Sequence, residues 1–312
     1  MPCPICTSKN THYFAHKDSY DYHRCSDCKT IFLHSMPTQK QLRVYYQKRN
    51  TYSDGLQNEK VIRKRSRIIL RKIAHIVPHA KTLCDVGSSY GFFLDEAYKN
   101  GYISTGIEPS KQIARHTKGI SQITTFIGEL QDYLNCKHNQ FDVVTCIHVL
   151  EHVRSPGTFI SLLSQLVKPG GVLYIETPNS DSHLLYAEKN HYTFLLPPEH
   201  IWLFSKDSIQ YFLPDNAKII CINTYSYSEH FMGIIKKIVL PVFRHSKQSE
   251  ESRSSDRIKC FITPNSASLI KHFRYIFFDK LLAPLFTGLL NLYHKGSILE
   301  LYIKINHDKS GL

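Results

Sequence analysis

Residues 81–91 read KTLCDVGSSYG, and this stretch decides the fold class. The apolar run that ends at Val86 predicts a buried strand, and the residues after Gly91 predict a helix that ends at Gly101. The glycines Gly87 and Gly91 predict a turn in which the main chain can approach a ligand closely. The helix N-terminus that follows favours a negatively charged group. A glycine turn alone also fits an ordinary tight connection, so the flanking sequence carries the rest of the prediction.

Apolar runs and amphipathic stretches alternate downstream of this turn. The alternation of strands with helices of about ten residues indicates an α/β protein with a doubly wound, parallel sheet. Upstream, residues 59–77 predict a helix that packs on the sheet through Ile69 and Ile73 and exposes a basic face. Further strands are expected at 102–108, 122–128, 141–147, 172–178, 217–227 and 297–305, and further helices at 110–118, 158–168 and 206–213.

An acidic residue, Glu108, ends the second expected strand, 21 residues after Gly87. A carboxylate in that position can accept hydrogen bonds from ribose hydroxyls. The phosphate-binding patterns GxxxxGK[ST] and GxGxxG are both missing from this region. The turn therefore lacks the signatures of a phosphate loop and of a pyrophosphate-binding turn.

Four ordered motifs resemble those of class I S-adenosylmethionine-dependent methyltransferases. They are TLCDVG…G (82–91), GIEP (106–109), FDVVTCIHVLEHV (141–153) and KPGGVLYIETPN (168–179), and the resemblance covers residues 81–230. It implies a Rossmann-like, doubly wound and mostly parallel seven-stranded sheet, with S-adenosylmethionine as the cofactor.

The resemblance also implies roles for individual residues. Glu108 would bind the ribose hydroxyls, and Ser89 stands in the turn where the family usually has a middle glycine. The residues around the methionine part of the cofactor would be Asp85, Gly87, Gly91, Ile147 and His148. The residues near the adenine would be Ile107, Pro109, Gly128, Glu129 and Leu130.

Two CxxC pairs stand near the N-terminus, with eighteen residues between them. Four thiolates at this spacing match the tetrahedral coordination of zinc, and a site filled by four cysteines is structural rather than catalytic. A redox pair or two chance pairs are the alternatives. The predicted ligands are Cys3, Cys6, Cys25 and Cys28, in a zinc-ribbon-like module that resembles one found in a branch of the family that modifies sugars and other small molecules.

The acceptor side is expected after the fifth strand, because substrate loops gather at the carboxyl ends of strands in open α/β sheets. His200 is the first candidate for the general base, with Glu199 orienting it, and His152 is the second. A structural histidine is the alternative for His200. The run HVLEH (148–152) matches the HxxEH pattern of metalloproteases, but His148 follows a strand directly, which argues against a protease helix.

The chain has 312 residues and a formal net charge of +13. The charge divides into +10 for residues 1–80, −4 for 81–230 and +7 for 231–312. Basic flanks are compatible with nucleic acid, anionic lipid or a phosphorylated substrate. The expected organisation is a zinc module at 1–50, the cofactor-binding core at 51–230, an apolar and basic helical insertion at 231–295, and a last strand and tail at 296–312.

These observations favour a methyltransferase that acts on a small molecule, with a sugar or glycan-precursor hydroxyl as the expected acceptor. The alternatives are methylation of RNA on the basic flanks, methylation of a sugar carbon, and a non-catalytic zinc-binding scaffold. No signal peptide or uncharged run of 18 apolar residues occurs, so a cytoplasmic protein is expected. The insertion leaves room for a peripheral membrane contact.

Overall fold

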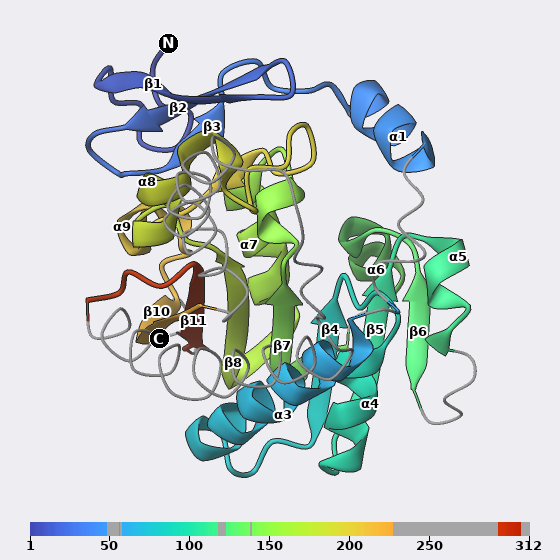
Figure 1. Ribbon diagram of the computed structural model, residues 1–312. Coiled ribbons are helices and arrows are strands. Elements are labelled where there is room, and N and C mark those ends of the chain that lie inside the picture. The colour runs from blue at the N-terminus through green and yellow to red at the C-terminus, as the bar shows by residue number, and fades with distance from the viewer. Residues whose placement is uncertain (49–55, 57, 118–122, 138, 227–292, 307–312) are drawn as a thin grey trace, which may run out of the picture.

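The computed structural model describes residues 1–48, 56, 58–117, 123–137, 139–226 and 293–306 (Figure 1). These residues form a large seven-stranded sheet with helices packed against it, and a small four-stranded sheet that holds the N-terminal segment. The two sheets lie next to each other, with the small sheet at the top of Figure 1. No helix among the described residues is long and apolar enough to cross a membrane.

The large sheet has the strand order β10-β11-β8-β7-β4-β5-β6. Strands β4 to β8 are parallel, and β11 is antiparallel to both of its neighbours, so the sheet is mostly parallel as predicted. The strands are β4 (Thr82–Val86), β5 (Ile103–Glu108), β6 (Thr124–Ile127), β7 (Phe141–Ile147), β8 (Val167–Pro178), β10 (Ala217–Tyr225) and β11 (Ile298–Ile305).

Helices cover both faces of this sheet. Because neighbouring residues of a strand point to opposite faces, Leu83 and Val143 join the apolar cluster under α3 and α4, while Cys84 and Val144 join the cluster that includes α6 and α7. This arrangement confirms the doubly wound fold. The main helices are α3 (Glu59–Ile76), α4 (Phe92–Lys99), α5 (Lys111–Ala114), α6 (Leu130–Cys136) and α7 (Pro156–Gln165).

Several elements differ from the sequence prediction. Helix α5 ends at Ala114, and the helix expected over 206–213 divides into α9 (Lys206–Ile209) and a 3-10 turn, η4 (Gln210–Phe212). The prediction that a helix runs to Lys168 was wrong. Helix α7 ends at Gln165 because Val167 already pairs with Phe141 in the β7–β8 ladder.

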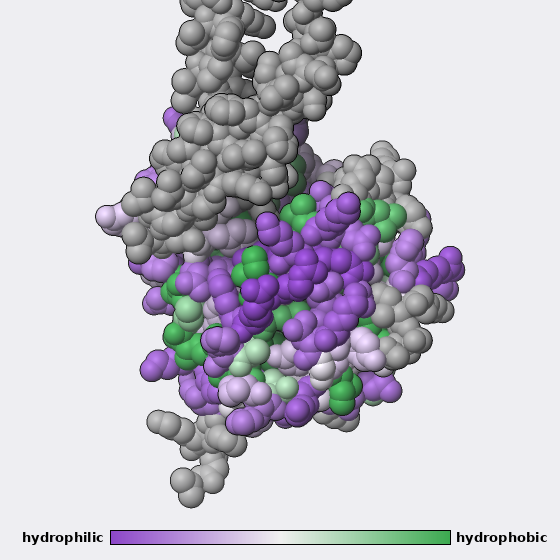
Figure 2. Space-filling model, turned by 60° about the horizontal axis from the view of Figure 1, so that its bottom comes forward, coloured by the Kyte–Doolittle hydropathy of each residue, from purple (hydrophilic) through white to green (hydrophobic). Residues whose placement is uncertain are grey.

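The expected exposed basic face of α3 is only partly present. Lys64 and Arg67 are exposed, and hydrophilic side chains gather on this face of the molecule (Figure 2). Arg65, however, is largely buried: its guanidinium donates to the carboxylates of Glu176 and Glu300 in the large sheet. The sequence prediction placed the positive charge of Arg65 on the solvent-exposed face of the helix, but this charge lies in the core beside the candidate site.

The small sheet has the order β1-β2-β3-β9 and combines two distant parts of the sequence. Strands β1 (Thr11–Lys17), β2 (Tyr20–Cys25) and β3 (Ile31–Leu33) come from the N-terminal segment, and β9 (Trp202–Leu203) comes from the chain after β8. The remaining elements are α1 (Gln39–Lys48), α8 (His183–Glu188), and the 3-10 turns η2 (Leu150–His152) and η3 (Lys189–His191). Most of the insertion predicted at 231–295 lies outside the described residues.

Candidate active site

The glycine turn between β4 and α4 requires both of its glycines. Gly87 and Gly91 have φ angles of 78° and 77°, which side-chain-bearing residues rarely adopt. A Cβ on Gly87 would lie 2.4 Å from Cγ2 of Val149, and one on Gly91 would lie 2.6 Å from Cγ2 of Thr117. Ser89, the residue at the usual middle-glycine position, also has a positive φ of 48°. Three of the five residues of this turn therefore have a left-handed backbone.

The carboxylate of Glu108 closes this turn from the end of β5. One oxygen accepts the N–H of Ser89 at 2.9 Å, and the other accepts the N–H of Ser110 at 2.8 Å. Burial raises the pKa of Glu108, and the two N–H donors oppose that rise. The side chain that the sequence assigned to the ribose is therefore held at the turn in a fixed orientation.

Asp85, on β4 just before the turn, is buried. The hydroxyl of Thr145 on neighbouring β7 donates to its Oδ1 at 2.6 Å. Burial raises the pKa of Asp85 to about 7; the Thr145 hydrogen bond opposes the rise and nearby Glu108 adds to it. Two carboxyl groups thus lie close together at one edge of the sheet.

The segments assigned to the adenine lie at the same edge. The N–H of Gly128 donates to the carbonyl of Glu108 at 3.1 Å, which joins the end of β6 to the end of β5. Glu129 is the N-cap of α6, and Leu130 is buried at the start of that helix. Ile107 is buried and Pro109 is exposed. The parallel strands therefore bring these residues to the carboxyl end of the sheet.

His148 follows Ile147 at the end of β7 and has a positive φ of 54°. Its Nδ1 lies 3.1 Å from Glu151, and its Nε2 lies 3.4 Å from Glu176. Burial disfavours the charged ring, but the two buried carboxylates outweigh burial and raise the pKa of His148 to about 10. The charge of this ring is balanced by the two carboxylates beside it, so His148, Glu151 and Glu176 form a buried ionic cluster at the end of β7.

Hydrogen bonds connect η2 to residues 199–202. The N–H of Ile201 donates to the carbonyl of Glu151 at 2.9 Å, and the indole N–H of Trp202 donates to the carbonyl of Val153 at 2.8 Å. These bonds bring His152 and His200 together, although the two residues are 48 positions apart in the sequence. The two ring planes meet edge to face at 73°, with centroids 4.8 Å apart.

The histidine candidates are oriented by main-chain carbonyls. Nδ1 of His200 lies 2.7 Å from the carbonyl of Phe194, and Nδ1 of His152 lies 3.1 Å from the carbonyl of Glu199. The group that orients His200 here is thus Phe194, in the place where the sequence suggested the Glu199 side chain. Burial, with His152 nearby, lowers the pKa of His200 to about 3, so the ring is neutral at physiological pH.

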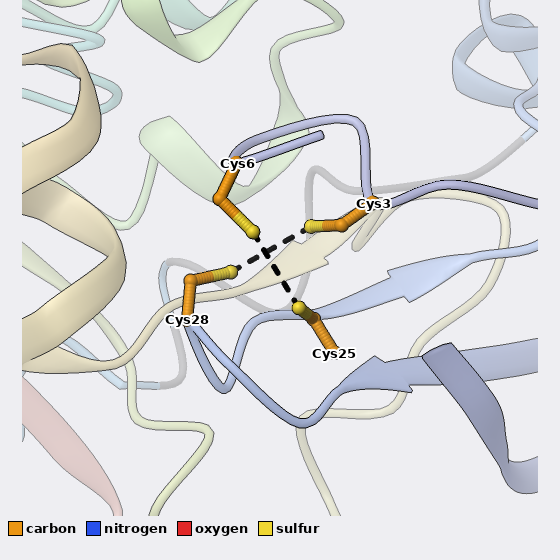
Figure 3. Close-up of side chains that lie close together, drawn as sticks. All are labelled: Cys3, Cys6, Cys25 and Cys28. Atoms are coloured by element: carbon orange, nitrogen blue, oxygen red, sulfur yellow. Dashed lines mark hydrogen bonds between the residues drawn. The ribbon is translucent and has the colours of Figure 1, made fainter. Parts of the chain in front are cut away.

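The four N-terminal cysteines gather as predicted (Figure 3). Their sulfur atoms all lie within 4.8 Å of one another, with Sγ–Sγ distances of 3.6 Å for Cys3–Cys28 and 3.5 Å for Cys6–Cys25. A zinc ion with Zn–S bonds of about 2.3 Å sets its sulfurs about 3.8 Å apart in a regular tetrahedron. The donor set therefore fits one tetrahedral zinc ion, which would hold the loops of the small sheet together.

The cysteine module packs directly on the segment that holds His200. The hydroxyl of Ser205 donates to the carbonyl of Cys28 at 2.8 Å, and the N–H of Leu33 donates to the carbonyl of Ile201 at 3.0 Å. An ion pair of 3.0 Å joins Arg24 to Asp181. The small sheet is thus continuous with the candidate acceptor side.

The seven-stranded sheet, the glycine turn and the acid at the end of β5 define the class I methyltransferase fold. Comparison with known proteins agrees: a family model described as a methyltransferase domain matches residues 58–214. The match spans half of the chain, which therefore belongs to this family of class I S-adenosylmethionine-dependent methyltransferases.

Named relatives match parts of the chain. The ubiquinone biosynthesis O-methyltransferase of Saccharophagus degradans is 36% identical over 104 residues, which cover 32% of this chain and 44% of that protein. The enzyme of the same name from Shewanella halifaxensis is 26% identical over 190 residues, covering 54% and 73%. A methyltransferase structure from Archaeoglobus fulgidus aligns at 16% identity with a TM-score of 0.47, covering 79% of this chain and 94% of that one.

Three residues of the site were not found from the sequence. Glu151 was noted only within the HVLEH pattern, Glu176 only within the resemblance, and Arg65 was placed on a solvated helix face. In the structure, Arg65 donates to Glu176, and Glu176 faces His148. The sequence signal that could have found this link is Glu176, a carboxylate within the otherwise apolar run of β8, because a buried carboxylate has to be paired.

Proposed function

We propose that the chain transfers the methyl group of S-adenosylmethionine to a hydroxyl oxygen of a small molecule, with a sugar or glycan precursor as the acceptor class. One observation carries the proposal. Gly87 of the cofactor turn packs against Val149, which follows His148 directly and precedes His152 by three residues. The predicted cofactor site and the only histidine pair of the candidate acceptor side in the described chain are therefore adjacent.

The residues present suit the cofactor. Glu108 can accept ribose hydroxyls at the turn, and the glycines Gly87 and Gly91 leave the main chain open to a ligand. His148 follows β7 directly, where the resemblance puts the methionine part of the cofactor. Bound S-adenosylmethionine supplies a methyl group that its sulfonium has already activated. The protein then has to align the acceptor and provide for its proton.

Loss of the hydroxyl proton is the step in which side chains act chemically. His200 and His152 stay the candidates, because both rings are oriented and His200 is neutral at physiological pH. The low pKa of His200 means that a proton taken by this ring is held weakly. Groups next to His200 therefore have to share the proton, or another positive charge has to occupy the place of that proton beside the ring.

The acceptor proposal has two parts, the methylated atom and the class of molecule, and each part has its own support. The relatives named above are O-methyltransferases of ubiquinone biosynthesis, which favours oxygen of a small molecule as the methylated atom. The sugar hydroxyl is supported by the cysteine module and by residues 197–205, both of which resemble segments of the sugar-modifying branch of the family. Methylation of RNA is less favoured, because Arg63 and Arg65 of the basic helix are paired with acidic side chains of the core.

A direct experiment is to incubate the full chain with methyl-labelled S-adenosylmethionine and three separate acceptor pools. The pools are nucleotide sugars and glycan precursors, phenolic quinone precursors, and bulk RNA. Mass spectrometry should find the label on an oxygen of a molecule from the first pool, and Glu108→Ala should remove it. Label in the phenolic pool alone would keep the enzyme class and overturn the sugar proposal, whereas label in RNA alone would overturn the small-molecule proposal.

A further inference from the structure

Three side chains at the acceptor side converge on one point. A carboxylate oxygen of Glu151 and one ring nitrogen each of His152 and His200 all lie within 4.8 Å of one another. These groups come from η2 and from the segment before β9, so a long-range contact builds the cluster. We propose that Glu151, His152 and His200 bind a divalent transition-metal ion, separate from the ion of the cysteine module.

The orientation of both imidazoles supports metal binding. A neutral imidazole has one N–H donor and one acceptor nitrogen. Nδ1 of His200 faces the carbonyl of Phe194, and Nδ1 of His152 faces the carbonyl of Glu199, so each Nδ1 carries the proton. Nε2 is then the nitrogen with the lone pair in both rings. Histidines that bind metals are held in this way, with the second ring nitrogen donating to a carbonyl.

The carboxylate has the same kind of support. Oε2 of Glu151 accepts the hydroxyl of Thr177 at 3.0 Å, and Oε1 lies 3.1 Å from Nδ1 of His148. Each of the three proposed ligands is therefore fixed by a different group behind it. A carboxylate with hydrogen-bonded oxygens and two fixed imidazoles form a preorganised ligand set, which needs little rearrangement to bind an ion.

The ligand set indicates the class of ion. Two imidazole nitrogens and one carboxylate oxygen suit zinc, iron(II), cobalt(II) or manganese(II), and they leave coordination positions open. Glu151 and His200 are buried, and His152 is partly exposed, so the open side lies toward His152. This differs from the four-cysteine module, in which the protein supplies every ligand.

The HVLEH pattern does not account for this site. In an HxxEH helix, both histidines of the pattern bind the ion. Here, His148 faces Glu151 and Glu176 instead, and His200, from outside the pattern, takes the second imidazole position. The cluster therefore combines two residues of the pattern with one that only the fold brings close.

A bound ion would have a defined use in methyl transfer, and this part of the inference rests on the proposed function. An acceptor oxygen at an open position would be polarised by the ion, which lowers the pKa of its hydroxyl so that water can take the proton. His152 and His200 would then act as ligands and not as proton acceptors. Loss of activity in a histidine variant fits either role, so metal content is the measurement that separates them.

The test uses the full chain, stripped of metal with a chelator, dialysed against Zn²⁺, freed of unbound ion and analysed for metal per chain. Wild-type protein should bind two equivalents, and His152→Ala should bind one. His75→Ala, which removes an exposed histidine of α3, should bind two. Glu151→Gln is a second variant that keeps the size of the side chain, and it should also bind one equivalent.

Co²⁺ in place of Zn²⁺ identifies the ligands. The equivalent lost in His152→Ala should lack the intense thiolate charge-transfer absorption that the cysteine-bound ion gives. Wild-type protein that binds only the thiolate-bound ion, or a folded His152→Ala that still binds two equivalents, would overturn the site. Binding of S-adenosylhomocysteine is measured on the same samples: lost cofactor binding with two metal equivalents would contradict the proposed function and leave the metal site standing.

Discussion

The phenolic hydroxyl of Tyr22 donates a 2.9 Å hydrogen bond to the main-chain carbonyl of His200. Tyr22 lies on β2 of the cysteine module, 178 residues away in the sequence, and both residues are buried. The bond ties the N-terminal sheet to the acceptor side of the methyltransferase fold. The module therefore positions the histidine pair as well as completing a sheet with β9.

The Tyr22 bond predicts an effect on catalysis without an effect on the cofactor. Tyr22→Phe should lower the free energy of unfolding by about 1 kcal/mol, the usual value of one hydrogen bond, and should lower turnover. Binding of S-adenosylhomocysteine should be unchanged. Tyr13→Phe, which alters an exposed tyrosine of β1, is the control. Turnover in Tyr22→Phe equal to that of the control would show that this bond does not position His200.

Loss of the ion bound by the cysteines should lower turnover more than Tyr22→Phe does. Cys25→Ser removes one of four ligands and should release one metal equivalent per chain, because zinc affinity depends on the complete set. The core should still bind S-adenosylhomocysteine, while turnover should fall because β3 and β9 separate. Cys136→Ser, at an exposed cysteine, should change neither property. Full metal content in Cys25→Ser would contradict the assignment.

Asp85 predicts a pH dependence of stability. Its pKa is raised to about 7 in the folded chain, against an ordinary value of 3.8, so folding favours the protonated form. The stabilisation is complete below pH 3.8 and is lost as the pH rises through 7. Asp85→Asn should therefore gain stability relative to wild type, and the gain should be larger at pH 8 than at pH 5 in urea unfolding.

Asp142 provides the opposite control for that measurement. It accepts the N–H groups of Lys81 and Thr82 and pairs with Lys168, and these contacts outweigh its burial and lower its pKa. Asp142→Asn should lose stability at both pH values. An Asp85→Asn gain that is equal at pH 5 and pH 8 would contradict the ionisation of a buried Asp85.

The geometry of the glycine turn predicts that Gly87→Ala lowers the free energy of unfolding for two separate reasons, backbone strain and a steric clash. Gly87→Ala should lower the free energy of unfolding by roughly 1–3 kcal/mol for the strained backbone alone, and more for the clash with Val149. Adding Val149→Ala should recover the clash part. Gly101→Ala, at a positive φ with no atom within 4 Å, measures the backbone part alone. Equal costs at Gly87 and Gly101 would show that the Val149 contact is unimportant.

The sequence predicted the parts of the fold that local patterns determine. Apolar runs at 82–87 and 141–147 became β4 and β7, and the glycines of the turn have the expected left-handed backbone. The two-residue strand β9 was not predicted, because only its pairing with β3 defines it as a strand. Pairing over 170 residues leaves no periodicity in so short a segment.

The candidate site also has one part that the local sequence predicts and another part that it does not. Glu108 was predictable from its distance to Gly87, since strand and helix lengths set that distance. The link from Arg65 through Glu176 to His148 was not predictable, because it depends on which residues of α3 and β8 face each other across the sheet. A charged residue within an amphipathic helix looks the same in sequence whether it faces water or a buried carboxylate.

We propose that S-adenosylmethionine binds at the carboxyl ends of β4 and β5 through Glu108, and calorimetry with S-adenosylhomocysteine tests this most directly. Wild-type protein should bind one molecule per chain. Glu108→Ala should weaken binding at least tenfold, because hydrogen bonds to a charged group are each worth about 1.5–3 kcal/mol. Asp215→Ala, at an exposed carboxylate, should bind like wild type. A folded Glu108→Ala that binds as tightly as wild type would contradict the account.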